Sequence, residues 1–363
     1  MWYNKKKDKS ESYDFVMCRE VIISFQIGTC QQIIFEVCDF CVELSRIGYF
    51  IIDILKLLIY YLCKERCVQI LPAQYRADGR IDMWKQKLGI SLGNHYSIPT
   101  EDIIKIAKAV GFDAISPEWE KDVDLDAVVT AAKECELYIQ SLHAPFGDSA
   151  NMWSGDINAS KPALEELLQS LEACHKYNIP ILVAHAWIGF DNISEPTEVG
   201  FQNYGRLIEK AAEYGIKIAL ENTEGEEYLF ALMDRFKDSE NVGFCWDSGH
   251  EMCYNHSVDL LARYGGRLIM THLNDNLGIS RFDGKTFWTD DLHLLPFDGV
   301  ADWDYNVRRL KTSNRLEFLN FELNIHSKPN RHENDCYEKL TLEEYFTEAY
   351  KRACKVAYKF QFV

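Results

Sequence analysis

From residue 87 onward, short apolar runs alternate along the chain with longer stretches in which apolar residues recur every three or four positions. The short runs have the length and residue content of buried strands, whereas the longer stretches have the period of amphipathic helices. We predict eight strands, at residues 87–93, 113–119, 138–145, 180–187, 217–223, 242–249, 268–275 and 317–324. A helix is predicted after each strand, beginning near Thr100, Leu125, Lys161, Gly200, Glu226, Ser257, Asp302 and Leu340.

Eight strand–helix units in about 280 residues are typical of a (β/α)8 TIM barrel, an α/β fold. We expect this barrel to span residues 83–363 and to follow an N-terminal extension of uncertain structure, residues 1–82. A doubly wound open sheet is the alternative, but it does not explain why residue types common in catalysis end six different strands. In a barrel all strands are parallel, so these ends gather on one face, where such enzymes keep their active sites.

The stretch 242–250, VGFCWDSGH, shows the pattern most clearly, because an apolar run opens directly onto an aspartate and, three residues later, a histidine. Other runs end on the same residue types, at His143, His185, Glu221, His272, Asp275 and Glu322. Taken singly, His143 or His185 would more often be a core histidine. Asp247 could be a helix N-cap, and Glu322 a buried ion-pair partner. Carboxylates that close apolar runs are costly to bury unless they are paired or bind a metal, so their joint occurrence favours a metal site.

The composition narrows the class of protein and its partners. With 363 residues, of which 47% are hydrophobic, the chain is globular and long enough to bury a large core. Its formal net charge of -17 makes it a poor non-specific partner for DNA or for an anionic membrane. Its 12 cysteines lack the spacing of a disulfide framework, which favours reduced thiols in a cytoplasmic enzyme.

The N-terminal extension differs from the rest of the chain. Its most apolar run, residues 47–63, is shorter than a typical membrane helix and contains Asp53 and Lys56. A packed helix or appendage is therefore favoured over membrane association. A signal peptide is also disfavoured, because the segment has no cleavage site of small residues. Two cysteine pairs suggest zinc, but an apolar helical run separates them where a zinc site would use a turn-rich knuckle, so ordinary thiols are favoured. These pairs are Cys38 with Cys41 and Cys63 with Cys67.

Nine residues resemble, in order, the ligand series of the xylose-isomerase-like TIM barrel superfamily (AP endonuclease family 2). They are His143, His185, Glu221 in ALENTEG, Asp247 and His250 in DSGH, His272 in THLND, Asp291 and His293 in DLH, and Glu322. That superfamily contains sugar and sugar-phosphate isomerases and epimerases, and also the endonuclease IV class of apurinic/apyrimidinic DNA-repair enzymes. Any single motif is weak, but nine matches in order, spread over residues 87–360, are specific.

For the epimerases, the resemblance implies one catalytic ion. Its ligands would be Glu221, Asp247, His272 and Glu322. One glutamate removes the proton α to a carbonyl, the ion polarises that carbonyl and stabilises an enediolate, and the other carboxyl group returns a proton. The catalytic residues would be Glu221, Glu322 and His250, with His250 on a substrate oxygen. The oxygen-rich set suits Mn²⁺, Mg²⁺ or Co²⁺, and the additional histidines suit Zn²⁺.

For the DNA-repair branch, the resemblance implies three zinc ions. His143, His185 and Glu221 would hold the first, a shared Glu221 with Asp247, His272 and Glu322 the second, and His250, Asp291 and His293 the third. A DNA backbone needs Lys and Arg on the loops that meet it. The loops expected on this face, such as EWEKDVDLD and TEGEE, are acidic. Nucleic acid is therefore disfavoured relative to a small sugar.

Contacts to a sugar are expected from His143, His185, Trp187, Trp246 and Asp275. The stretch HLLPFDGVADW, residues 293–303, also resembles the HLxPGxG-xDW loop of sugar isomerases. Phe297 and Asp298 alter its glycine-rich part, the part that the resemblance implies would place the substrate. Four other side chains could hold a phosphate, although solvated surface charge is favoured for each. They are Arg281, Lys285, Lys328 and Arg331.

We therefore predict a metal-dependent sugar or sugar-phosphate isomerase or epimerase that acts through an enediolate. The alternatives are an endonuclease IV-like phosphodiesterase on abasic DNA, another metal-dependent lyase, dehydratase or hydrolase on the same barrel, and a non-catalytic sugar-binding barrel. The sequence determines neither the sugar, its phosphorylation, nor the metal. The oligomeric state is equally undetermined, and a homo-oligomer remains open.

Because Met83 directly precedes the start of the barrel, one hypothesis is that residues 1–82 are not native coding sequence. A protein that begins at Met83 is expected to fold and to keep its activity, since every predicted strand–helix unit remains. Circular dichroism, thermal unfolding and metal content of the truncated and full-length chains test this expectation. Loss of folding or of activity on truncation would refute it.

Overall fold

The computed structural model describes residues 86–93, 96, 98–190, 195–255, 258–280 and 287–362, together with two short strands that precede them. These strands, β1 (Gln74–Tyr75) and β2 (Ile81–Asp82), pair antiparallel with each other. The chain divides into two units, Met1–Lys85 and Gln86–Val363, and the barrel lies in the second.

The predictions for the N-terminal extension concern the apolar run 47–63 and four cysteines, all of which lie outside the described residues. Within the described part of the chain, no helix has both the length and the apolarity that crossing a membrane requires. The cysteines of the described barrel are free thiols, at Cys135, Cys174, Cys245, Cys253, Cys336 and Cys354.

All eight predicted strands are present, with bounds that differ from the prediction by a few residues. The third is split into two segments, β5 (Tyr138–Ile139) and β6 (Leu142–His143). The others are β3 (Lys87–Leu92), β4 (Ala114–Pro117), β7 (Ile181–His185), β8 (Lys217–Glu221), β9 (Val242–Asp247), β10 (Leu268–His272) and β11 (Phe318–Phe321).

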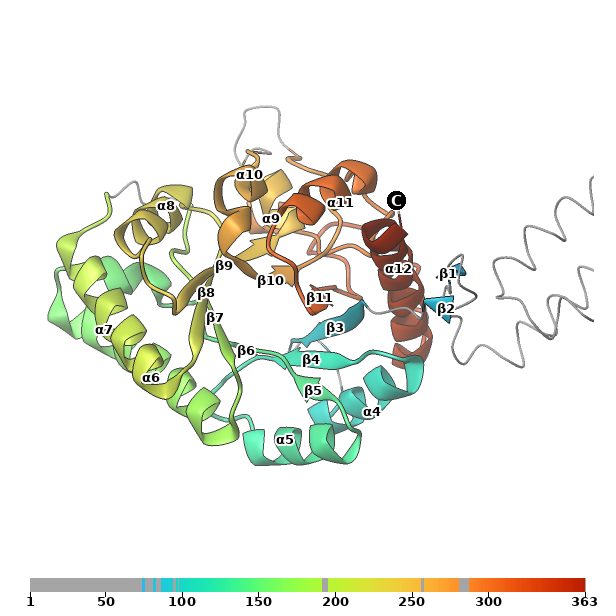
Figure 1. Cartoon of the computed structure of the whole chain (residues 1–363), viewed down its shortest axis with the longest axis horizontal. Helices are drawn as coiled ribbons and strands as arrows, with labels where there is room; N and C mark the ends of the chain where they lie inside the picture. The colour runs from blue at the N-terminus through green and yellow to red at the C-terminus, as the bar shows by residue number, and fades with distance from the viewer. Residues whose placement is uncertain are drawn as a thin grey trace, which may run out of the picture. The chain divides into compact units, whose positions relative to one another are not determined.

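Two parallel sheets make up the barrel wall. One has the strand order β10-β9-β8-β7-β6, and the other has the order β11-β3-β4-β5. Backbone bridges close the two seams between them, from Glu118 to His143 on one side and from Leu273 to Phe321 on the other. The strands form a ring with the helices outside it (Figure 1), which confirms the predicted (β/α)8 barrel.

Amphipathic helices cover the outside of this ring. In α4 (Thr100–Val110), Ile103, Ile104 and Ala107 are buried, and the helix ends at Gly111 with a φ of 118°, a backbone conformation that favours glycine. Further helices are α5 (Leu125–Glu134), α6 (Ile157–Tyr177), α7 (Glu198–Tyr214), α8 (Glu226–Arg235), α10 (Leu260–Tyr264), α11 (Trp303–Thr312) and α12 (Leu342–Phe362). Additional short elements, which the sequence did not predict, are α9 (Ser248–Cys253), η1 (Ser149–Trp153), η2 (Gly265–Arg267) and η3 (Trp288–Asp290).

The barrel interior is layered. Successive residues of a strand point to opposite sides, so residues two apart share the interior. One layer is apolar and fully buried, and consists of Val183, Ala219, Cys245 and Met270. Two residues nearer the carboxyl end, the same four strands carry His185, Glu221, Asp247 and His272. An apolar layer of the barrel interior therefore lies directly beneath a layer of imidazoles and carboxylates.

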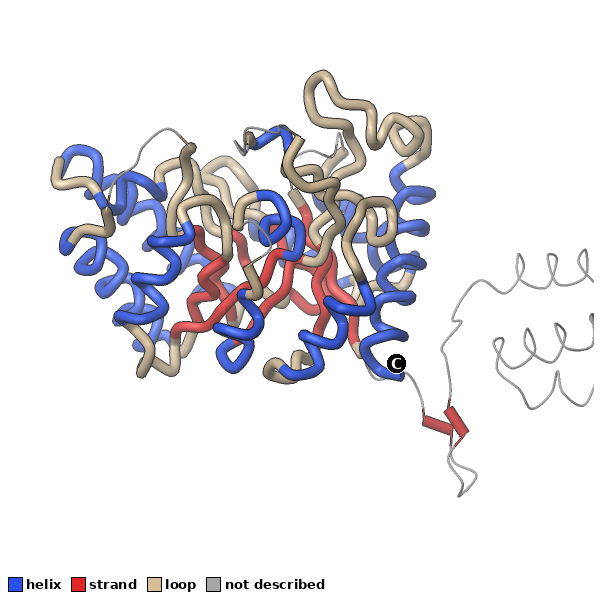
Figure 2. Tube along the Cα trace, turned by 90° about the horizontal axis from the view of Figure 1, so that it is seen from above, coloured by secondary structure: helices blue, strands red, loops and turns tan. Residues whose placement is uncertain are grey.

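Long loops gather at one end of the barrel (Figure 2). Asp275 fastens the loop 293–303 there, because its buried carboxylate accepts hydrogen bonds from Phe297 N (2.9 Å), Ala301 N (3.0 Å) and Trp303 Nε1 (2.9 Å). Phe297, which occupies a glycine position of the motif that this loop resembles, has a φ of 76°. The loop therefore keeps a glycine-like backbone at that position although the side chain has changed.

Gly299 packs against this carboxylate, since a Cβ there would lie 2.1 Å from Asp275 Oδ1 and 2.4 Å from Asn276 O. We expect Gly299→Ala to lower the free energy of unfolding by about 1–3 kcal/mol, the usual cost of overpacking a filled site. Gly155→Ala is the control, because nothing lies within 4 Å of the position of its Cβ. Urea unfolding measures both variants, and equal stabilities would contradict the packing described.

Candidate metal centre

The carboxylate of Glu221, at the end of β8, lies at the centre of the site and is fully buried. Two imidazole nitrogens face each of its oxygens. His143 Nε2 lies 3.3 Å and His185 Nε2 lies 3.4 Å from Oε2. His250 Nδ1 lies 3.3 Å and His272 Nδ1 lies 3.0 Å from Oε1. An unpaired carboxylate here would cost several kcal/mol, and these four rings offset that cost.

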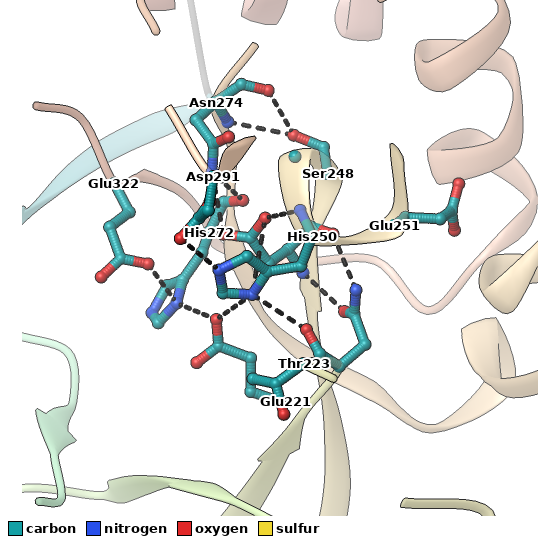
Figure 3. A network of polar contacts seen from close by, with 12 residues as sticks. Glu221, Thr223, Ser248, His250, Glu251, His272, Asn274, Asp291 and Glu322 are labelled. Atoms are coloured by element: carbon teal, nitrogen blue, oxygen red, sulfur yellow. Dashed lines mark hydrogen bonds and ion pairs between the residues drawn. The ribbon is translucent and has the colours of Figure 1, made fainter. Parts of the chain in front are cut away.

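Glu322 brings a second carboxylate to the same imidazole (Figure 3). Its Oε2 lies 2.8 Å from His272 Nδ1, the nitrogen that also faces Glu221. Asp247 completes a group of four, in which one ligand atom from each residue lies within 4.8 Å of the others. The structure thus brings together the four residues that the sequence analysis named as ligands of a catalytic ion.

Further groups with ligand spacing adjoin this one, and two of them add residues of the expected series. These two are His143 with His185 and Glu221, and Asp247 with His250 and His293. Asp291 joins the second group, since its Oδ2 lies 3.3 Å from His250 Nε2 and 3.0 Å from His293 Nε2. All nine residues of the expected ligand series therefore lie in one continuous cluster.

Asp247 also serves as the N-cap of α9, the structural role considered for it from the sequence. Its Oδ1 accepts a hydrogen bond from His250 N at 2.7 Å, and its Oδ2 accepts one from Asn274 Nδ2 at 2.8 Å. Asn222 holds its backbone, accepting from Asp247 N at 2.8 Å and donating to Asp247 O at 2.9 Å. The sequence analysis missed both asparagines. The signal available in the sequence was that Asn222 and Asn274 each stand just after an apolar run.

Cys245 is a further residue that the sequence analysis missed. It belongs to the apolar layer beneath the site, and its thiol forms another group with ligand spacing together with Glu221 and His272. Burial raises the pKa of this thiol to about 12, so it is protonated at neutral pH. Its place two residues before Asp247, on the inward side of the same strand, was the available signal.

Burial and charge shift the pKa values of the cluster in opposite directions. Burial raises the pKa of Asp247 to about 6. Burial alone would lower the pKa of His293, but the charge of Asp291 outweighs it and raises that pKa to about 9. Burial would raise the pKa of Glu322, but the positive charge of His272 outweighs it and brings that pKa to about 2. The ionised carboxylates of Glu322 and Asp291 therefore face the protonated rings of His272 and His293, whereas burial lowers the pKa of His185.

The donor set of the cluster fits a divalent cation. Carboxylate oxygens and imidazole nitrogens are ligands that Zn²⁺, Mn²⁺ and Co²⁺ accept. Two carboxylates converge on the single nitrogen His272 Nδ1, and one N–H cannot satisfy both with good geometry. Among the described residues, the buried atoms His185 Nδ1 and Asp291 Oδ1 have no hydrogen-bond partner. A cation among these donors would satisfy the convergent atoms better than a proton does.

The cluster forms the floor of a pocket of about 500 Å³. Its lining includes His143, His185, Glu221, His250, Asp291, His293 and Glu322. Two aromatic side chains of the lining, Phe146 and Trp288, are 42% and 52% exposed. Phe146 stacks on His185 with ring centres 4.8 Å apart. The pocket therefore combines a polar floor with open ring faces, as small-molecule sites do.

Three residues that were expected to contact a sugar lie away from this pocket. Trp246 faces the surrounding helices, where its Nε1 donates to Glu251 Oε2 at 2.9 Å. Trp187 stacks on Tyr228 of α8, with ring centres 4.1 Å apart. Asp275 is fully buried and fastens the loop 293–303. These contacts occupy all three side chains, so we assign them structural roles.

The amino-acid sequence is similar to a known protein family and to several individual proteins. Residues 104–340, more than half of the chain, match the family model described as "Xylose isomerase-like TIM barrel". "Uncharacterized protein y4fM" of Sinorhizobium fredii is 35% identical over 128 residues, which are 34% of this chain and 38% of that protein. "Probable endonuclease 4" of Cenarchaeum symbiosum is 24% identical over 148 residues, which are 38% of this chain and 50% of that protein. Both matches cover less than two thirds of the relative.

Solved structures show the same fold. A zinc-bound IOLI protein superposes with a TM-score of 0.60 at 20% identity, covering 76% of this chain and 99% of that chain. A D-allulose 3-epimerase from Methylomonas sp., in complex with D-allulose, superposes with a TM-score of 0.54 at 15% identity, covering 74% and 96%. At these identities the likeness establishes the fold. Together with the match over residues 104–340, it shows that the chain belongs to the xylose isomerase-like TIM barrel family.

Proposed function

We propose that this protein is a metal-dependent isomerase or epimerase of a sugar or sugar phosphate. The observation that carries the proposal is the pair of carboxylates, Glu221 and Glu322, that converge on His272 at the floor of the pocket. Epimerisation needs one group to remove a proton from a carbon and another to return it on the opposite face. The sugar epimerases among the structural neighbours support this class of reaction.

The residues at the floor of the pocket have two roles in this proposal, cation binding and proton transfer. The cation would be held by Glu221, Asp247, His272 and Glu322. Bound there, it would polarise a substrate carbonyl and make the adjacent C–H group more acidic. The Glu322 side chain is 18% exposed, whereas that of Glu221 is 0% exposed. We therefore assign proton removal, which leaves an enediolate, to Glu322. Glu221 would return a proton that it first receives from a protonated imidazole beside it, such as His143, whose Nε2 lies 3.3 Å from Glu221 Oε2. His250 would donate to a substrate oxygen.

A phosphodiesterase acting on abasic DNA is the second candidate. The observation that favours it is the contact of Asp291 with His250 and His293, the three residues that the DNA-repair branch would use for a third zinc ion. The relative named probable endonuclease 4 supports it as well. Among the described residues that line the pocket, however, Lys328 is the one lysine or arginine. A DNA backbone is bound by several such cations, so a small sugar is the better match.

Glu322→Gln keeps the size of the side chain but removes its charge and its capacity to accept a proton. We expect it to slow metal-dependent exchange of the proton α to the carbonyl of a ketose by about 10²-fold or more, the usual contribution of a general base. Glu338→Gln is the control, because Glu338 follows the same strand but is exposed and pairs with His326. NMR of D-fructose and D-ribulose in D₂O measures the exchange.

Each alternative function predicts a different result in these assays. Unchanged exchange in Glu322→Gln would contradict the assignment. Nicking of a duplex with an abasic site, without exchange on the ketoses, would replace it by the second candidate. A binding protein without catalysis would keep metal-independent affinity for sugar when Glu221 and Glu322 are both changed to Gln.

Metal binding is expected to release protons. Burial lowers the pKa of His293, but Asp291 outweighs it and raises that pKa to about 9. Burial also lowers the pKa of His272, but the negative charges of Glu221 and Glu322 outweigh it and hold that pKa well above its usual range. Both rings are therefore protonated at pH 7 in the metal-free protein. A cation held by Glu221, Asp247, His272 and Glu322 must displace the proton of His272, and its positive charge lowers the pKa of the adjacent His293.

The apparent affinity for Mn²⁺ or Zn²⁺ should therefore rise with pH up to about 9 and fall as the pH is lowered. Calorimetry in buffers of different ionisation enthalpy counts the protons released. His293→Gln should reduce that count, whereas His332→Gln should not, because His332 is exposed and pairs with Asp335. Heats that do not depend on the buffer would contradict this prediction.

A further inference from the structure

Charge is unevenly distributed around the pocket. Its acidic lining residues are Glu118, Glu221, Glu224, Asp291 and Glu322. Against these, Lys328 is the one lysine or arginine among the described lining residues. It comes from the loop that follows β11, whereas the convergent carboxylates form the floor. A ligand that spans the pocket therefore meets a cluster of acids and histidines at one part and a single ammonium at another.

The Lys328 ammonium lies over the ring of Trp288, with Nζ 5.5 Å from the ring centre. Trp288 lines the same pocket and is 52% exposed. No carboxylate of the described residues forms an ion pair with Lys328. A cation over an indole ring is attracted to the ring while its N–H donors stay free. The ring therefore holds this ammonium at the pocket wall with its donors available to a ligand.

The loop that carries Lys328 is fastened to the turn that carries Trp288. Arg331 Nη1 lies 3.0 Å from Oδ1 of Asp290, a fully buried carboxylate of η3. Glu333 joins the two basic residues, since its Oε1 accepts from Lys328 N at 3.2 Å and its Oε2 lies 3.5 Å from Arg331 Nε. These contacts fix the backbone on both sides, so the lysine and the tryptophan are positioned before a ligand arrives.

The same contacts distinguish the cations that the sequence offered for phosphate binding. Arg331 is neutralised by two carboxylates and holds the loop together. Lys328 has no such partner in the described part of the chain, which sets it apart from a structural cation. Arg281 and Lys285 lie outside the described residues.

We propose that Lys328 binds a terminal anionic group, a phosphate or a carboxylate, of an open-chain sugar whose carbonyl end lies at Glu221 and Glu322. The proposal rests on the proposed function and specifies its substrate class as an acidic sugar. Trp288 packs against the sugar chain while the ammonium pairs with the anion. The pocket of about 500 Å³ contains both the floor and this anion subsite.

Charge gives such a substrate one favoured direction in the pocket. The carboxylates of Glu221 and Glu322 at the floor repel an anionic end, and the ammonium of Lys328 attracts it. A neutral sugar has no corresponding preference. Removal of the ammonium should therefore weaken the binding of acidic ligands selectively and leave the binding of neutral ones unchanged.

Three open-chain probes test the proposal: D-sorbitol, D-sorbitol 6-phosphate and D-gluconate. Calorimetry on the full chain with Mn²⁺ bound measures their affinities. We expect one of the anionic probes to bind about tenfold or more tightly than D-sorbitol, as for a hydrogen bond to a charged group. Lys328→Met should abolish this preference, and Lys328→Arg should keep most of it. Lys355→Met is the matched control, because Lys355 Nζ also lies over a ring, 3.9 Å from the centre of Phe297, but is not part of the pocket lining.

The outcomes separate the subsite from the reaction. A lysine-dependent preference for the phosphate probe assigns a phosphate, and one for D-gluconate assigns a carboxylate. Equal affinity for all three probes, or a preference that survives in Lys328→Met, overturns the proposal. A lysine-dependent preference without proton exchange on any ketose would refute the isomerase reaction and leave the anion subsite in place.

Discussion

The buried carboxylate of Glu221 is the constraint on which the rest of the barrel depends. It lies on β8, the middle strand of the five-stranded sheet, and the four imidazoles that surround it come from both sides of that strand. His143 belongs to β6 and His272 to β10, the two edge strands of this sheet. Those edges are also where the second sheet closes the ring. Opening the barrel would therefore separate the charge from the groups that compensate it, so closure of the fold and integrity of the site are one requirement.

The layering of the interior explains how a stable core and a reactive site share the same strands. Val183, Ala219 and Cys245 pack in a dry layer, and the next inward position on each strand carries His185, Glu221 or Asp247. The apolar layer keeps water away from the underside of the cluster and strengthens every interaction between its charges. The open side of the cluster faces the pocket. The apolar layer thus contributes to stability, whereas the candidate site lies at the carboxyl end of the strands, the end at which TIM barrels carry their active sites.

The floor alone does not choose between proton transfer on a sugar and attack on a phosphodiester. Both reactions are compatible with a set of carboxylates and imidazoles around divalent cations. The wall of the pocket differs, because a polyanion requires many cations and the described lining offers the single ammonium of Lys328. One ammonium held over Trp288 matches one anionic group on a small molecule. The single ammonium of the pocket wall therefore favours a small anionic substrate over a nucleic acid, although the floor is compatible with both reactions.

The alternation of strands and helices was predictable because it depends on periodicity, and residues such as Glu221 and His272 stood out because they end apolar runs. The full series of nine candidate ligands came from the resemblance to the xylose-isomerase-like superfamily. Side-chain direction and pairing were not predictable. Trp246 and Asp247 are adjacent in sequence, yet one faces the helices and the other the site, since neighbouring strand residues point to opposite sides. Arg331 and Lys328 look alike in the sequence, but Arg331 pairs with the distant Asp290, whereas Lys328 has no ion-pair partner among the described residues. Periodicity is a local property of the chain, whereas these partners are brought together only when the ring closes.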